Sequence, residues 1–155
     1  MTMVNRPHRV GELMLRDFVT VSPGTTLIEA EAVVRSARLR HLLVVEGGIV
    51  IGLVSHRELL DRFLAASRGL ADADRLGSVT IEHLVRTEPV TISPDASLEV
   101  AASRMLALRI GCLPVAIPSP RGPQLVGLLT EADLLRAAYL PAPPESCARR
   151  GGEPD

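Results

Sequence analysis

Two short segments of the sequence each place a hydroxyl three residues before a carboxylate: Ser55-x-x-Glu58 and Thr130-x-x-Asp133. At the start of a helix this spacing is typical of a capping box, in which the hydroxyl and the acid each accept a hydrogen bond from a free backbone amide. The same amides, with the positive end of the helix dipole, can instead hold an anion. The carboxylate can also accept two hydrogen bonds from a vicinal diol such as a ribose. The spacing alone leaves both roles open, although Glu58 fits the cap better than the shorter Asp133.

Both pairs belong to a phrase that the chain repeats, GLVSHRELL and GLLTEADLL. Three segments of the first copy match three of the second in the same order: 18–30 with 89–101, 37–45 with 108–116, and 52–60 with 127–135. The first two matches are 71 positions apart and the last is 75 apart, so the second copy has gained four residues. We place the gain within 117–124, IPSPRGPQ, where Pro and Gly indicate a surface loop. Ordered matches of this kind indicate an internal duplication.

Each copy is expected to fold as β-α-β-β-α. Apolar residues recur at helical spacing after Thr26 and Ser97, which suit the N-cap, and aliphatic runs mark the strands. The predicted helices cover 26–39, 56–66, 97–110 and 131–139, and the predicted strands cover 19–21, 42–45, 49–54, 90–92, 113–117 and 125–129. Gly47-Gly48 supplies a hairpin turn. The predicted fold class is therefore α+β, built from tandem pseudo-symmetric repeats.

The duplication also sets the expected domain organisation. We predict an N-terminal tail, a first repeat, a polar connector, a second repeat and a C-terminal tail of disordered composition, at 1–9, 10–66, 67–78, 79–140 and 141–155 respectively. Apolar residues make up 46% of the chain and aromatics only 2%, so the core is aliphatic. One copy of roughly 60 residues buries too little surface to be stable alone. The copies are therefore expected to pack face to face, with two equivalent clefts along their boundary.

Composition argues against several classes of function. The formal net charge is −1 and the chain has one Tyr and two Phe, which does not suit a nucleic-acid interface. The longest apolar runs, 42–45 and 49–54, are too short to cross a bilayer, and the N-terminus has no apolar signal core. Cys112 and Cys147 form no C-x-x-C pair and are interpreted as free thiols, so we expect a cytoplasmic protein.

Catalytic and metal-binding interpretations have little support. The candidate metal ligands are His41, His56, His83 and Cys112, and no two of them have ligand spacing on one helix. Cys112 opens a predicted buried strand, where a thiol packs as a small apolar group. We therefore expect no metal, no required cofactor and no enzymatic activity.

The second copy combines features that favour a ligand. Its last helix follows an apolar strand segment that begins with Gly127, where backbone can approach a cleft closely. The helix amides and Thr130 could hold a phosphate, and Asp133 could hold a ribose. Apolar strand residues could flank a flat base. Together these groups describe a nucleotide.

An ordered set of motifs resembles a known family. The set comprises V-T-[VI]-S-P before the first helix of each copy, R-H-L-L-V-V and G-C-L-P-V-A at the second strand, and G-L-[VL]-[ST]-x-x-[ED]-L-L at the last helix. Over about residues 10–140 it is similar to a tandem pair of cystathionine β-synthase (CBS) domains, a Bateman module. The resemblance implies a regulatory, non-catalytic module that binds adenine nucleotides or S-adenosylmethionine between its repeats and forms a disc-like homodimer.

By the same resemblance, the main site falls on the second copy. The ribose-binding acid falls on Asp133 and the hydroxyl near phosphate on Thr130. The remaining positions would provide apolar backbone around the base and a contribution from the first copy: Gly127, Leu128, Leu129, Leu113 and Pro114, with Thr20, Thr25 and Ala30.

The sister site falls on the equivalent positions, which are Ser55, Glu58, Arg40 and His41, with Thr91 and Ala101 from the opposite copy. Glu58 stands where the family usually has Asp, so we expect this site to be weaker or empty. The basic pair Arg40-His41 corresponds to Gly111-Cys112 in the second copy. The better ribose acid and the better phosphate partner therefore lie in different copies.

Two hypotheses follow. In the first, an adenine nucleotide or S-adenosylmethionine acts as an effector and changes the geometry of the homodimer, and the change is transmitted to a regulated protein that the sequence does not identify. The ligand must then bind the two shapes with different affinities. In the second, the protein is a ligand-free dimerisation scaffold whose repeats complete each other's core. Neither hypothesis involves a membrane or a nucleic acid.

Overall fold

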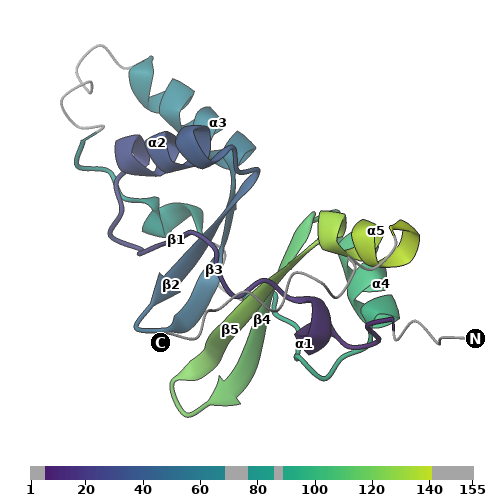
Figure 1. Cartoon of the computed structure of the whole chain (residues 1–155). Helices are drawn as coiled ribbons and strands as arrows, with labels where there is room; N and C mark the ends of the chain where they lie inside the picture. Colours follow the sequence, from purple (N-terminus) through teal and green to yellow (C-terminus); the bar gives the residue numbers. More distant parts are fainter. Residues whose placement is uncertain (1–5, 69–76, 86–88, 141–155) are drawn as a thin grey trace, which may run out of the picture.

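The chain forms two similar halves that share one sheet (Figure 1). The computed structural model describes residues 6–68, 77–85 and 89–140. The first half contains α1 (Val10–Leu13), β1 (Thr20–Val21), α2 (Leu27–Ala37), β2 (His41–Glu46), β3 (Ile49–Ser55) and α3 (His56–Ser67). The second contains the 3-10 helix η1 (Ile81–Leu84), α4 (Leu98–Leu108), β4 (Cys112–Ser119), β5 (Gly122–Thr130) and α5 (Glu131–Tyr139). The predicted α+β class is confirmed; the predicted C-terminal tail and most of the connector lie outside the described residues.

The five strands are arranged in the order β1-β2-β3-β5-β4. Each half contributes an antiparallel hairpin, β2 with β3 and β4 with β5, and the pair Ile49–Gln124 joins the hairpins. In the first half, β1 runs parallel to β2. In the second half, the equivalent contact is a single bridge between Ile92 and Val115, so the strand predicted at 90–92 is reduced to that bridge.

Local sequence sets the ends of the long helices. Each begins after a Ser or Thr whose hydroxyl accepts a hydrogen bond from the amide three residues later; these N-caps are Thr26, Ser55, Ser97 and Thr130. Helices α2 and α4 both end at an arginine in the left-handed conformation, Arg38 (φ 52°) and Arg109 (φ 55°). Glycine is the usual residue at such a position. The caps explain why helix starts were predictable from the sequence.

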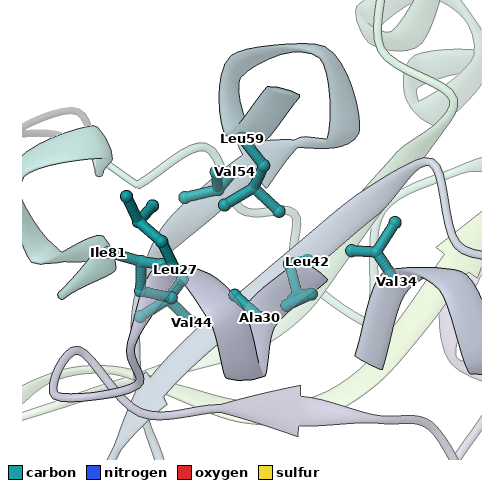
Figure 2. Close-up of a cluster of buried hydrophobic side chains, with 8 residues drawn as sticks. All are labelled: Leu27, Ala30, Val34, Leu42, Val44, Val54, Leu59 and Ile81. Carbon is teal, nitrogen blue, oxygen red and sulfur yellow. The ribbon is translucent and has the colours of Figure 1, made fainter. Parts of the chain in front are cut away.

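Each half has its own aliphatic core. The first core lies between α2, α3 and the β2–β3 hairpin and consists of Leu27, Ala30, Val34, Leu42, Val44, Val54, Leu59 and Ile81 (Figure 2). The second consists of Val10, Ile92, Ala101, Met105, Leu113, Val115 and Leu129. A smaller cluster of Leu43, Val50 and Ala116 joins residues of both halves, and Phe18 and Leu128 pack against it. The halves therefore share apolar surface as well as a sheet.

The two halves exchange their leading segments. Val10, from the start of the first repeat, is fully buried in the second core, and Ile81, from the start of the second repeat, is fully buried in the first (Figure 2). Backbone hydrogen bonds follow the same exchange, because the Val10 amide donates to the Ala96 carbonyl and the Ile81 amide to the Thr25 carbonyl, each at 2.9 Å. The units that pack together therefore differ from the units of sequence.

The extra residues of the second half lengthen a hairpin and do not form the predicted surface loop. Through 117–124, β4 and β5 continue to pair, with Pro118 opposite Pro123 and Ser119 opposite Gly122. Proline has no amide to donate, so these positions add little to a ladder, but its extended backbone is compatible with a sheet edge. The expectation of a loop at 117–124 is corrected by this pairing.

The tip of the longer hairpin contacts the tip of the shorter one. Gly47-Gly48 forms the predicted turn between β2 and β3, with φ of 56° and 81°. The guanidinium of Arg121 lies so close to this turn that a Cβ on Gly47 would be 2.8 Å from its Nη2 atom. The Leu125 amide donates to the Gly48 carbonyl at 2.9 Å. The insertion thus enlarges the contact between the two halves.

Candidate functional site

Among the charged side chains of the described residues, that of Asp133 alone is buried, with 5% of the residue's surface exposed. It lies in the first turn of α5. Its Oδ2 atom accepts hydrogen bonds from the Thr130 amide at 3.0 Å and the Thr130 hydroxyl at 2.6 Å, and the Asp133 amide donates back to that hydroxyl at 3.3 Å. The capping box is complete. The expectation that Asp133 is a poorer cap than Glu58 is therefore not met.

The other carboxylate oxygen of Asp133 faces Arg136. The Nη1 atom of Arg136 lies 3.4 Å from Oδ1, from a position three residues further along α5. The Arg136 side chain is 67% exposed and that of Asp133 is 6% exposed, so the arginine stands between solvent and a buried carboxylate. A diol that approaches Oδ1 must meet this guanidinium.

The equivalent pair in the first half has the same geometry. The Oε2 atom of Glu58 accepts from the Ser55 amide at 2.8 Å and the Ser55 hydroxyl at 2.9 Å. His41 lies opposite Ser55 in the β2–β3 pairing. Three residues predicted for the sister site are therefore neighbours. Where α5 has Arg136, the equivalent position of α3 is Asp61.

The backbone of β5 is not open to a ligand at the predicted place. The amides and carbonyls of Leu15 and Leu128 bond to each other at 2.8 and 2.9 Å, so the chain after α1 covers this edge of β5. A Cβ on Gly127 would lie 2.4 Å from the Met14 sulfur and 3.0 Å from the Leu15 carbonyl oxygen. The close approach that the sequence assigned to a ligand is made here by Met14 and Leu15.

Several predicted site residues have side chains in the cores. Leu113, Leu129, Ala30 and Ala101 each have 0% of their surface exposed, and Pro114 is also buried. The side chains of these residues are therefore not available to a ligand here, and the prediction that the backbone of Leu129, with Leu113 and Pro114, flanks a base stays a prediction. These residues are buried because they lie on the apolar faces whose spacing identified the helices and strands.

The threonines predicted for the two sites make other contacts here. Thr20 is exposed in β1, which is separated from β5 by two strands. The Thr25 carbonyl accepts the Ile81 amide, and the Thr91 carbonyl accepts the Arg104 guanidinium at 2.7 Å, so both serve packing between segments. The sheet does not bring Thr20 to the Thr130–Asp133 pair.

Arg40 connects the two halves near the start of α5. Its Nη1 atom lies 3.9 Å from Oε1 of Glu131, the residue that directly follows the Thr130 cap. Both side chains are largely exposed, at 89% and 60%, so the pair contributes little to stability. The pair matters because of its position: Arg40 places a positive charge of the first half at the N-terminus of α5 in the second half.

A pocket of about 560 Å³ lies between α4 and α5 beside this ion pair. Its apolar wall is formed by Ala102, Met105, Leu106, Ile110, Leu134 and Leu135, and its polar rim by Arg40, His41, Arg109, Gly111 and Glu131. Asp133 is not among the lining residues, although Leu134 and Leu135 of the same helix are. The pocket is therefore on a different face of α5 from the predicted ribose acid, and the sequence did not predict it.

Two titratable groups at equivalent positions are both held neutral. Burial lowers the pKa of His41, against the opposing attraction of Glu58. Burial also raises the pKa of the Cys112 thiol to about 11, so this thiol is not an activated nucleophile. Within the described residues, no three His, Cys, Asp or Glu side chains gather in a way that could hold a metal ion. Over the same residues, the helices lack the length and apolar character that crossing a membrane requires.

Sequence reasoning missed the residues that cover the predicted site. Met14, Leu15 and Arg136 were not among the predicted site residues. The spacing of Asp133 and Arg136 is the i, i+3 spacing of a helical ion pair, so that contact had a sequence signal. The position of Met14 had none, because it depends on the exchange of leading segments.

The profile of the CBS domain family matches residues 10–65 and 81–140, which is most of the chain. A CBS domain-containing protein of Dictyostelium discoideum is 30% identical over 146 residues, covering 88% of this chain and 97% of that one. CBS domain-containing protein YhcV of Bacillus subtilis is 29% identical and covers 81% of each chain. The match to inosine-5'-monophosphate dehydrogenase of Korarchaeum cryptofilum, 26% identical, covers 85% of this chain but a quarter of the enzyme's length.

Solved structures share the fold. A putative acetoin utilization protein (AcuB) from Vibrio cholerae has a TM-score of 0.65 and 27% identity, over 84% of this chain and 89% of that one. CBSX2, solved in complex with AMP, has a TM-score of 0.69 and 24% identity, over 85% and 96% of the two chains. The CBS domain pair of MJ0100, solved with 5'-methylthioadenosine and S-adenosyl-L-methionine, has a TM-score of 0.65 and 20% identity, over 84% and 95%.

Proposed function

Because this chain belongs to the CBS domain family and carries two of its repeats, we propose that it is a regulatory module that binds an adenosine-type ligand between the repeats. In this proposal, ligand binding changes the relation between the halves and is sensed by another polypeptide. The observation that carries the proposal is the start of α5, where Thr130 holds Asp133 and where Arg40 of the first half reaches Glu131.

Two parts of a nucleotide, the ribose and the phosphate, find suitable chemistry near this helix start. The Asp133 carboxylate offers Oδ1 to a ribose hydroxyl, since Oδ2 is used by the cap. The positive end of the α5 dipole favours a phosphate, although the Glu131 amide already donates to the Gly111 carbonyl at 2.9 Å and the Asp133 amide to the Thr130 hydroxyl at 3.3 Å. Arg40 adds a positive charge, because its guanidinium already reaches Glu131 at 3.9 Å. The acid of the second copy and the cation of the first copy therefore lie near the same helix N-terminus, although the pocket that Arg40 borders is on another face of α5.

The relatives support the class of ligand and not its identity. CBSX2 was solved with AMP, and the MJ0100 pair with 5'-methylthioadenosine and S-adenosyl-L-methionine. Both ligand sets contain adenosine, so AMP, ADP, ATP and S-adenosylmethionine are the effectors to test. We place the stronger site at Asp133 and the weaker at Glu58, whose longer side chain serves its cap in the same way.

We also propose that the protein acts as a homodimer through the outer faces of its helices. Large apolar side chains remain in solvent on α4 and α5, including Leu106 at 80%, Leu135 at 58% and Tyr139 at 81% exposure. A second copy of this chain would cover them, as the family resemblance implies, since apolar patches of this kind mark interfaces. Sedimentation should give the mass of a dimer, and Leu106→Glu should reduce it to a monomer. A wild-type monomer would contradict this part of the proposal.

Thermal melting with AMP, ADP, ATP, adenosine and S-adenosylmethionine tests the main proposal. A ligand at about 100 times its dissociation constant should stabilise the protein by about 2.7 kcal/mol. Asp133→Asn keeps an acceptor for the Thr130 amide and should abolish the shift, whereas Glu58→Gln is the matched control and should leave it almost unchanged. A larger loss in Glu58→Gln would move the working site to the first half.

The ligand-free scaffold remains a second candidate. It is favoured by the caps themselves, because Thr130 and Ser55 already bind the two acids, and by Met14, which covers Gly127. If none of the five ligands shifts the melting temperature while the dimer persists, the scaffold is the better account.

A further inference from the structure

The two halves differ in charge beside their otherwise equivalent acids. Both Asp133 and Glu58 use one carboxylate oxygen in a capping box with similar distances. Three residues further along, α5 has Arg136 where α3 has Asp61. The capping geometry does not require this difference, because both boxes close. The arginine therefore needs a separate explanation.

Arg136 stands at the oxygen that the cap leaves for a ligand. Its Nη1 atom is 3.4 Å from Oδ1 of Asp133, whereas both Thr130 donors bond to Oδ2. The carboxylate is almost fully buried and the guanidinium is mostly in solvent, at 6% and 67% side-chain exposure. A diol needs a carboxylate oxygen that accepts its protons, and a guanidinium at that oxygen competes for the same lone pairs.

We propose that Arg136 is a gating residue that covers Asp133 and must leave Oδ1 before a ribose can bind. This inference rests on the proposed function and adds a determinant of affinity to the same site. The equivalent position of α3 is Asp61, so an arginine at this position is a feature of the second half.

The gate has a distinctive dependence on salt. A partly exposed ion pair is weakened by salt, because the Debye length falls from about 30 Å at 0.01 M to about 3 Å at 1 M. A neutral nucleoside gains nothing from long-range attraction, so its own binding gives no reason for a salt effect. With Arg136 as the gate, adenosine should bind more tightly at high salt, because salt frees Oδ1.

Calorimetric titration of the 155-residue chain with adenosine at low and high salt tests the gate. Arg136→Gln removes the charge and should tighten adenosine binding about two- to fivefold at low salt, the range expected for releasing one partly exposed pair. It should also abolish the salt dependence. Arg62→Gln removes one positive charge from the exposed face of α3 and is the matched control, with wild-type affinity and salt response expected.

The outcomes separate this inference from the function on which it rests. If wild type binds adenosine and Arg136→Gln binds it with the same or weaker affinity, the gate is refuted and the site stands. If neither protein binds adenosine at any salt concentration but another of the five ligands shifts the melting temperature, the gate is refuted and the site stands; if none of the five binds, both are refuted. Arg136→Lys keeps the charge and should remain salt-dependent; it guards against a fold defect in the first variant, which circular dichroism also checks.

Discussion

Ile81→Ala should disturb the core of the first half, although Ile81 belongs to the second repeat of the sequence. The side chain is fully buried against residues of the first repeat, and its amide donates to the Thr25 carbonyl at 2.9 Å (Figure 2). The equivalent residue of the first repeat is Val10, which is buried in the second core and whose amide donates to the Ala96 carbonyl at the same distance. Val10→Ala is therefore the matched variant.

The expected loss of stability follows from the carbons removed. Ile→Ala removes three carbons at about 0.8 kcal/mol each, and the cavity left in a close-packed core adds to this. We expect the free energy of unfolding to fall by about 3 kcal/mol for Ile81→Ala, and by about 2 kcal/mol for Val10→Ala, which removes two carbons. Urea denaturation measures both values.

Methyl spectra identify which core is affected. Ile81→Ala should shift the methyl resonances of Leu27 and Val44, and Val10→Ala should shift those of Leu113 and Leu129. If Ile81→Ala instead shifts Leu113 and Leu129 and leaves the first core unchanged, each repeat packs its own leading segment and the exchange is refuted.

Three further predictions concern single positions. Gly47→Ala should lower the free energy of unfolding by about 1 kcal/mol, because φ is 56° there and an L-residue is strained. Gly24→Ala is the control and should leave it unchanged, because nothing lies within 4 Å of the new Cβ. Urea denaturation compares the two variants. His41 has a lowered pKa in the folded state, so the unfolded chain binds more protons, and the free energy of unfolding should fall as pH drops below about 6.5. His41→Asn should reduce this dependence of stability on pH, measured by denaturation from pH 5 to 7. In a Cys147→Ser background, iodoacetamide at pH 8 should label Cys112 far more slowly in the native protein than in urea, since the thiol pKa is about 11; equal rates would contradict its burial.

The elements were predictable because their signals are local. Helix α5 has the predicted bounds, Glu131–Tyr139, since a Thr cap and helical apolar spacing lie within a few residues of each other. The duplicated order was predictable because insertions and matches can be read along one chain. The region 117–124 was assigned wrongly because its Pro and Gly residues were interpreted as a surface loop, whereas Pro118 and Pro123 pair at the end of a long hairpin.

The exchange of segments could not be predicted from the sequence. Val10 and Ile81 occupy equivalent positions of two repeats with similar aliphatic cores, so the pattern suits packing within a repeat as well as packing across repeats. For the site, the sequence located the Thr130–Asp133 pair but not its neighbours. Met14 reaches Gly127 only as a result of the exchange, so its contact depends on tertiary structure.

Because Val10 and Ile81 are each buried in the opposite half, the two halves should hold together without an intact chain between them. If a protease severs the connector, each fragment still has its first turn locked inside the other, and the nicked protein stays assembled until a core melts. Co-expressed as separate peptides, the fragments should find each other and reconstitute the native shape, whereas either fragment alone lacks a piece of its own interior.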